Sequence, residues 1–149
     1  MNSPHITAGV HLPQAGPAAS GDSITEVAQC AEKLGFSDVW VSDHLVVPSE
    51  AEYPPSAYIY EPLAVMSWVA AKTTRIRIGT TVLVLPMRNP VVTAKSLASI
   101  DQLSGGRTIL GTAAGWLKEE FSALGIPFNE RGPRTDEALE IIQRLWDDD

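Results

Sequence analysis

The feature that most constrains the fold is a regular alternation of apolar, β-branched segments with helical segments along the 149 residues. Strands are predicted at residues 5–12, 36–45, 75–85 and 107–113, and helices at residues 24–34, 61–72, 90–103, 117–124 and 135–146. The strand cores begin near residues 5, 38, 75 and 107, so successive starts are 33, 37 and 32 residues apart. A strand, a crossover helix and two loops need roughly 30 residues, so this period predicts a parallel sheet of four β/α units.

Capping signals mark the ends of these helices. Ser23 and Glu26 fit a capping box at the start of the first helix. Gly35 stands where a left-handed C-cap ends it. Asn89 followed by Pro90 is typical of a helix start, because asparagine caps free amides and proline suits the first turn.

Two architectures use a parallel sheet of such units: a doubly wound open sheet and a (β/α)₈ barrel. The first strand–helix junction, LPQAGPAASGDS at residues 12–23, has no G-x-G-x-x-G motif, which argues against the usual dinucleotide-binding fold. A full barrel needs about 250 residues, and four units make half of one. Four barrel strands alone leave two apolar edges unpaired. We therefore expect residues 1–149 to be a piece of a larger barrel or a half that pairs with another half, without a second domain.

Composition narrows the functional class. The chain is 44% hydrophobic and 19% charged, which is typical of a soluble globular domain. Its net charge of −7 argues against a basic face for nucleic acid or anionic membranes. The longest apolar stretch, residues 82–87, is far shorter than the ~20 residues of a membrane span. We expect a cytoplasmic enzyme with a small-molecule substrate and neither a nucleic-acid nor a membrane partner.

Cysteine and histidine give little support for a metal site. Cys30 is the single cysteine, which excludes an intramolecular disulfide and a cysteine-based zinc cluster, and we expect it in the core. His5 and His11 lie in the first predicted strand without a carboxylate partner, so they are poor metal ligands. The chain also has no phosphate-loop, H-E-x-x-H or G-x-S-x-G motif.

Polar residues interrupt the apolar pattern at the carboxyl ends of the predicted strands, where parallel α/β proteins place their sites. Asp43 and His44 follow the second strand. Histidine titrates near neutral pH, so this pair could contact a ligand and move a proton. The alternative is structural: Asp43 caps the following loop and His44 packs on it. The residues alone leave both interpretations open.

Four further features at this edge also have two interpretations each. The segment 79–82 (GTTV) either contacts a ligand or is an ordinary buried strand. Arg88 either binds an anion or pairs with a surface carboxylate. The small residues from Gly111 to Gly115 admit a planar ligand or a phosphate near the backbone, and they equally suit a tight turn. Trp116 either stacks on a ligand or packs as a staple on the next helix.

Four segments, taken in order, resemble the bacterial luciferase-like monooxygenase superfamily, and specifically its branch of coenzyme F420-dependent (deazaflavin) oxidoreductases. They are VSDHL (41–45), RIRIGTTVLVLPMRNP (75–90), AKSLASIDQLSGGRTILGTAAGW (94–116) and KEEFSALGIPFNERGPRTDEALEIIQRLW (118–146). The resemblance covers nearly the whole chain but only the amino-terminal half of a family member. It implies a TIM (β/α)₈ barrel of the luciferase-like type, of which residues 1–149 are the first four β/α units, a half barrel.

The resemblance also implies a site for coenzyme F420, with FMN as the alternative, at the carboxyl ends of the strands. By position, Asp43 and His44 match residues beside the cofactor ring, with His44 as the catalytic residue that manages the proton. Thr81 and Val82 match the place where many members have a non-proline cis peptide that supports the ring. The other matching positions form further edges of the cofactor pocket: Arg88, Asn89, Gly111, Gly115 and Trp116.

Two departures from the family pattern bear on function. In some deazaflavin-dependent dehydrogenases a carboxylate acid follows the fourth strand, where this chain has Trp116, which argues against sugar-phosphate dehydrogenation by that route. In the family, the second half of the barrel supplies most contacts to the cofactor's phosphates. A half without those charge-assisted contacts should bind the cofactor weakly.

The resemblance thus implies hydride transfer between reduced coenzyme F420 and a small organic substrate. The first alternative is an FMN-dependent monooxygenase fed by a separate reductase, which would use the same residues. The second is a catalytically silent, truncated half barrel that acts only by assembly, as a homo-oligomer or with a missing carboxyl-terminal half.

Overall fold

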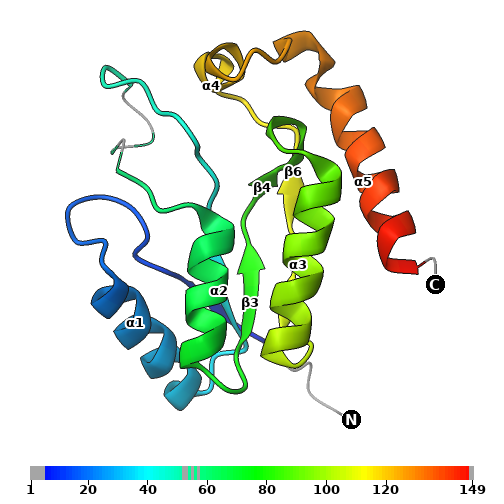
Figure 1. The fold of residues 1–149 in the computed structure, drawn as a ribbon. Coiled ribbons are helices and arrows are strands. Elements are labelled where there is room, and N and C mark those ends of the chain that lie inside the picture. The colour runs from blue at the N-terminus through cyan, green and yellow to red at the C-terminus, as the bar shows by residue number, and fades with distance from the viewer. Residues whose placement is uncertain (1–5, 52–53, 55, 57, 148–149) are drawn as a thin grey trace.

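The computed structural model describes residues 6–51, 54, 56 and 58–147. Its strands are β1 (Gly9–His11), β2 (Asp38–Val41), β3 (Arg77–Thr80), β4 (Leu83–Val84), β5 (Thr108–Ile109) and β6 (Thr112–Ala113). Its helices are α1 (Gly21–Leu34), α2 (Pro62–Lys72), α3 (Pro90–Ser104), α4 (Lys118–Ala123) and α5 (Arg131–Asp147), with short 3₁₀ turns at η1 (Leu85–Met87) and η2 (Phe128–Glu130). Figure 1 shows α1, α2 and α3 in a row in front of the strands, with α5 beside α3 and α4 beyond the strands' carboxyl ends.

The order of the strands identifies the architecture. Within the described residues, four strands form a parallel sheet in the order β1-β2-β3-β5, which is also their order along the chain. A doubly wound sheet would reverse its order at a switch point, whereas the strands of a barrel follow one another in sequence. The predicted parallel β/α architecture is therefore confirmed, and its strand order is that of half a barrel.

The sheet and its helices share one apolar core. Val39, Val41 and Ile78 of the sheet are fully buried, as are Ala28 of α1 and Met66 of α2. Burial on this scale contributes roughly 25 cal/mol per Å² of apolar surface removed from water. This burial explains why the strand sequences are continuous runs of apolar residues. Helix α5 packs against α3 and extends the helical layer.

The strand predictions at residues 75–85 and 107–113 are each wrong at one point, because each predicted strand is broken into two short ones. Strand β3 ends at Thr80, the Thr81–Val82 peptide is cis, and β4 then pairs with β6 in a separate two-stranded sheet. Thr80 Oγ1 donates to the Gly111 carbonyl at 2.7 Å and accepts its N–H at 3.1 Å. A Cβ at position 111 would collide with the Thr80 carbonyl oxygen. The two breaks therefore lie against each other, and only glycine permits this approach.

The predicted helix caps are partly confirmed. Gly35 ends α1 with φ +86°, and Asn89 Oδ1 accepts from the amides of Val91 and Val92 at the start of α3. The capping box of α1 lies one turn earlier than predicted. Ser20 is the N-cap, and Ser23 completes the box at N3.

The prediction that Cys30 belongs to the core is wrong, because its side of α1 faces solvent. The buried positions of that helix are Ile24, Ala28 and Ala31.

No helix in the described part of the chain is both long enough and apolar enough to cross a membrane. His5 lies outside the described residues.

A buried arginine, Arg107, directly precedes β5 and binds backbone carbonyls of neighbouring segments. The Arg107 guanidinium donates to the carbonyls of Ala70, Thr73, Ile76 and Ser104 at 2.7–3.2 Å, and to Thr73 Oγ1 at 2.8 Å. The residue is only 8% exposed. Because its planar donors match acceptors on three separate segments, Arg107 connects the end of α2, the start of β3 and the end of α3.

Replacing Arg107 with methionine is expected to lower the free energy of unfolding by about 1–3 kcal/mol, because buried carbonyls lose their donors. Urea unfolding followed by tryptophan fluorescence measures the change. Arg144→Met is the matched control, since Arg144 pairs with Glu140 on the exposed face of α5 and should change stability by less than ~0.5 kcal/mol. Equal losses in the two variants would contradict this account of Arg107.

Candidate functional site

A cavity of about 470 Å³ lies at the carboxyl edge of the sheet. It is lined by Ser42, Asp43, His44, Thr81, Val82, Val84, Ala113, Ala114, Gly115, Trp116, Glu120 and Arg131. Among the predicted site residues, Asp43, His44, Thr81, Val82, Gly115 and Trp116 are in this lining. Arg88, Asn89 and Gly111 lie outside it: Arg88 is behind Asp43, Asn89 caps α3, and Gly111 meets Thr80.

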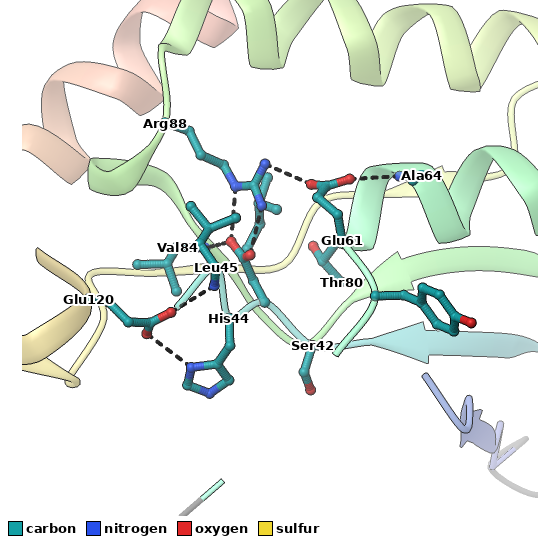
Figure 2. A network of polar contacts seen from close by, with 12 residues as sticks. Ser42, His44, Leu45, Glu61, Ala64, Thr80, Val84, Arg88 and Glu120 are labelled. Carbon is teal, nitrogen blue, oxygen red and sulfur yellow. Dashed lines mark hydrogen bonds and ion pairs between the residues drawn. The ribbon is translucent and has the colours of Figure 1, made fainter. Parts of the chain in front are cut away.

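His44 is paired with a carboxylate that sequence reasoning missed. Its Nδ1 lies 2.9 Å from Glu120 Oε2, and only 12% of the His44 side chain and 3% of the Glu120 side chain are exposed. Glu120 Oε1 also accepts the amides of Leu45 at 2.7 Å and Val46 at 3.1 Å. Figure 2 shows Glu120 between the histidine ring and this backbone. One carboxylate thus holds both the side chain of His44 and the loop that follows it.

A sequence signal for Glu120 does exist. Leu117 and Phe121 are buried, and Glu120 follows Leu117 by three residues, on the same face of α4. Glu119, beside it in sequence, is exposed. An acidic residue on the apolar face of a short helix indicates a buried partner, because a buried charge needs one.

Asp43, which is in the lining, and Arg88, which is outside it, form a buried ion pair that acts as a brace. Arg88 donates to Asp43 through Nε at 3.0 Å and Nη2 at 2.7 Å, and Asp43 Oδ2 also accepts the Val84 amide at 2.9 Å. Arg88 Nη1 reaches Glu61 Oε1 at 2.8 Å, and Glu61 Oε2 caps α2 through the Ala64 amide (Figure 2). Burial opposes the charge on Arg88, but its hydrogen bond with Asp43 and the charges of Asp43 and Glu61 raise the pKa of the guanidinium.

This brace favours a structural role for both of its members. The Asp43 side chain has no exposed surface, and its oxygens already accept three hydrogen bonds. The brace ties the end of β2 to β4 and to the start of α2. It therefore fixes the backbone on which His44 is carried. Cofactor contact by Asp43 and Arg88 stays a prediction.

The wall around Thr81 and Val82 is held by short polar contacts that pass through Ser42, another lining residue. The Thr81 amide donates to the Val41 carbonyl at 2.7 Å, and Ser42 Oγ donates to the Thr81 carbonyl at 3.1 Å. His11 Nε2 lies 2.8 Å from Ser42 Oγ. The Thr81–Val82 peptide is cis, as the family resemblance implies. Val82 is 36% exposed and lines the cavity.

Two residues after β6 shape the other part of the lining. Gly115 has φ +83°, and a Cβ there would lie 2.6 Å from Val84 Cγ1 and 3.0 Å from the Phe121 ring, so glycine permits close packing. Trp116 meets His44 edge-on, with ring centroids 6.0 Å apart and planes at 79°. Trp116 is 55% exposed, which favours a ligand-facing position over a staple buried against α4.

The lining fits a flat, largely uncharged ring. Val82, Ala113, Ala114 and Gly115 present small or apolar surface, and Ser42 and His44 supply polar groups. Among the described lining residues, Arg131 is the one cation, and it also packs over the Phe128 ring at 4.0 Å. The ring part of a flavin or deazaflavin fits this chemistry. A phosphate tail needs more donors than these residues provide.

Comparison with known proteins gives the family. The protein-family model described as "Luciferase-like monooxygenase" matches residues 1–149. The chain belongs to this luciferase-like family. Similar curated proteins include the F420-dependent glucose-6-phosphate dehydrogenases of Kineococcus radiotolerans, 37% identical, and Amycolatopsis mediterranei, 39% identical. Each match covers 85% of this chain and 37% or 38% of the dehydrogenase, so the chain spans less than two fifths of their length.

Solved luciferase-like structures have the same fold over the same region. The monooxygenase RslO1 from Streptomyces bottropensis is 31% identical with a TM-score of 0.80, and the match covers 95% of this chain and 43% of RslO1. An F420-dependent secondary alcohol dehydrogenase, solved with an F420-acetone adduct, is 26% identical with a TM-score of 0.78, covering 97% of this chain and 43% of that one. The predicted half of a luciferase-like barrel is confirmed.

Proposed function

We propose that the chain carries the ring-binding half of a deazaflavin-dependent oxidoreductase, which transfers hydride between reduced coenzyme F420 and a small organic substrate. His44, Trp116 and the Thr81–Val82 wall line one cavity, and this arrangement carries the proposal. When bound, coenzyme F420 supplies or accepts the hydride. The residues of this chain bind the ring, exclude water and move the proton.

The roles of these residues follow from their positions. Val82 packs on the ring, and Ser42 holds the backbone of that wall through the Thr81 carbonyl. Trp116 limits access of water to His44. When a substrate alcohol is oxidised, its hydroxyl proton passes to Nε2 of His44. In the reverse direction the imidazolium returns that proton to the carbonyl oxygen.

The relatives bear on the substrate. The F420-dependent secondary alcohol dehydrogenase, solved with an acetone adduct, supports a small alcohol or ketone. The glucose-6-phosphate dehydrogenases share more sequence identity with this chain. A sugar phosphate nevertheless needs a cluster of phosphate donors, and Arg131 is the one cation among the described lining residues. We therefore place small, uncharged organic substrates first.

An FMN-dependent monooxygenase is the second candidate. The observation in its favour is the likeness to the monooxygenase RslO1, at 31% identity.

Both candidates need the remaining β/α units of the barrel. Strands β1 and β5 are the edges of the described sheet, and their unpaired backbone groups support pairing with a carboxyl-terminal half or with a second copy.

Titration of the chain with coenzyme F420 and with FMN, read by fluorescence polarisation, tests the proposal. We expect saturable, micromolar binding of coenzyme F420, with the oligomeric state fixed by sizing. Tighter binding of FMN would support the second candidate. Val82→Asp should weaken binding at least tenfold, because a charge replaces the apolar wall, at a cost of about 1.4 kcal/mol or more.

The control for that titration is Val91→Asp, the same change on α3 at a valine that is 54% exposed and outside the cavity lining. It should bind like the wild type. Saturable binding that Val82→Asp and Val91→Asp weaken equally would place the cofactor elsewhere. Failure of both cofactors to bind would leave the silent half barrel as the better account.

A further inference from the structure

We propose that Glu120 is a positioning residue that holds His44 in a single tautomer, with hydrogen on Nδ1 and with Nε2 unprotonated. The inference rests on the proposed function only for its catalytic consequence. The tautomer itself follows from contacts within this chain and can be measured without cofactor or substrate.

Three donors converge on the Glu120 carboxylate. The amides of Leu45 and Val46 can only donate, so Oε1, at 2.7 and 3.1 Å from them, is an acceptor. Oε2 lies 2.9 Å from Nδ1 of His44. An ionised carboxylate accepts at both oxygens, and three converging donors satisfy it. The hydrogen between Oε2 and His44 therefore belongs to Nδ1.

The His44 ring has little freedom to change its hydrogen-bond partner. The His44 side chain is 12% exposed and Glu120 is 3% exposed, so little water competes for this hydrogen bond. The Trp116 ring lies edge-on to the imidazole. Figure 2 shows the remaining ring nitrogen on the side turned away from Glu120.

The consequence is a direction for proton transfer. A neutral imidazole with hydrogen on Nδ1 has its lone pair on Nε2, which can take a hydroxyl proton. The resulting imidazolium is stabilised by the Glu120 carboxylate, in the same way that a buried acid orients a catalytic histidine in other enzymes. Because Glu120 also holds the Leu45 and Val46 amides, it places the loop and the proton acceptor together.

The tautomer is measured by two-dimensional ¹⁵N–¹H NMR of the histidine rings in the ¹⁵N-labelled chain, above the pH at which histidine is protonated. The protonated and unprotonated ring nitrogens resonate far apart, and the ring carbon protons distinguish Nδ1 from Nε2. The signals of His44 are identified by their loss in His44→Gln. We expect Nε2 to be the unprotonated nitrogen, and hydrogen on Nε2 in the wild type would overturn the proposal.

The Glu120→Gln variant provides a second test of the tautomer. Its amide oxygen can still accept from Leu45 and Val46, while its NH₂ group turns to His44 and forces Nδ1 to accept. We expect the hydrogen to move to Nε2, so the tautomer reverses. Glu120→Asp keeps a carboxylate and should retain the wild-type tautomer. Glu119→Gln makes the same change of charge at the exposed neighbouring position and should change nothing.

These outcomes are separable from those of the cofactor titration. An Nδ1–H tautomer in a chain that binds neither cofactor would keep this inference and remove the proposed function. Cofactor binding by a chain with hydrogen on Nε2 would support the proposed function and overturn this inference. An unchanged tautomer in a folded Glu120→Gln variant would show that something other than Glu120 fixes the ring.

Discussion

Replacement of Asp43 with alanine is expected to lower the free energy of unfolding by about 3–5 kcal/mol, because it leaves a buried charge without its main partner. The Arg88 side chain is 12% exposed and would keep only Glu61, which is itself 39% exposed. The Val84 amide would lose its acceptor as well. Urea unfolding followed by tryptophan fluorescence measures the loss.

The matched control for Asp43 is Glu140→Ala. Glu140 also pairs with an arginine, Arg144, at 2.6 Å, but both side chains are more than 60% exposed. Exposed pairs contribute about 0–1 kcal/mol, so this variant should unfold close to the wild type. Asp43→Asn should fall between the two, since one amide oxygen still accepts while the NH₂ group faces donors. Losses of similar size for Asp43→Ala and Glu140→Ala would contradict the brace.

Replacement of His44 with glutamine is expected to reduce turnover by about 10²- to 10⁴-fold, the usual contribution of a positioned acid or base. Glutamine keeps a similar length, so the wall of the cavity is retained. It cannot take a proton at the position of Nε2. Turnover of the chain combined with the remaining β/α units is followed by the absorbance of coenzyme F420, with 2-propanol as the test substrate.

Cofactor affinity is the internal control for His44→Gln. His44 presents one edge of the lining, whereas Val82 and the small residues after β6 form the apolar surface that a ring would cover. We expect the dissociation constant for coenzyme F420 to change by less than about threefold, which is below 1 kcal/mol. An unchanged rate, or a loss explained wholly by weaker cofactor binding, would remove the proton-transfer role of His44.

Local sequence signals located most of the fold. The strand period and the apolar runs predicted parallel β/α units, and Gly35 and Asn89 marked helix ends that the structure confirms. These signals work because the apolar pattern within one helix or strand, and the caps at its ends, depend on residues close together along the chain. The misplaced capping box shows their limit: serine, threonine and acidic residues recur within one turn, and Ser20 and Ser23 both fit.

The site was harder to predict, because its decisive contacts join residues far apart in sequence. His44 and Glu120 are 76 residues apart, and Asp43 and Arg88 are 45 apart. The pattern named His44, Asp43 and Arg88 as candidates. It could not show that Asp43 pairs with Arg88 and that His44 pairs with Glu120.

By itself, then, the sequence determined the β/α units, their parallel order and the strand ends at which chemistry is possible. Tertiary structure alone decided where β3 and β5 end, because the contact between Thr80 and Gly111 at these ends joins residues 31 apart in sequence. It also decided which polar residues line the cavity and which form its support. The physical reason is that a buried charge is tolerated only with a partner, and long-range packing chooses that partner.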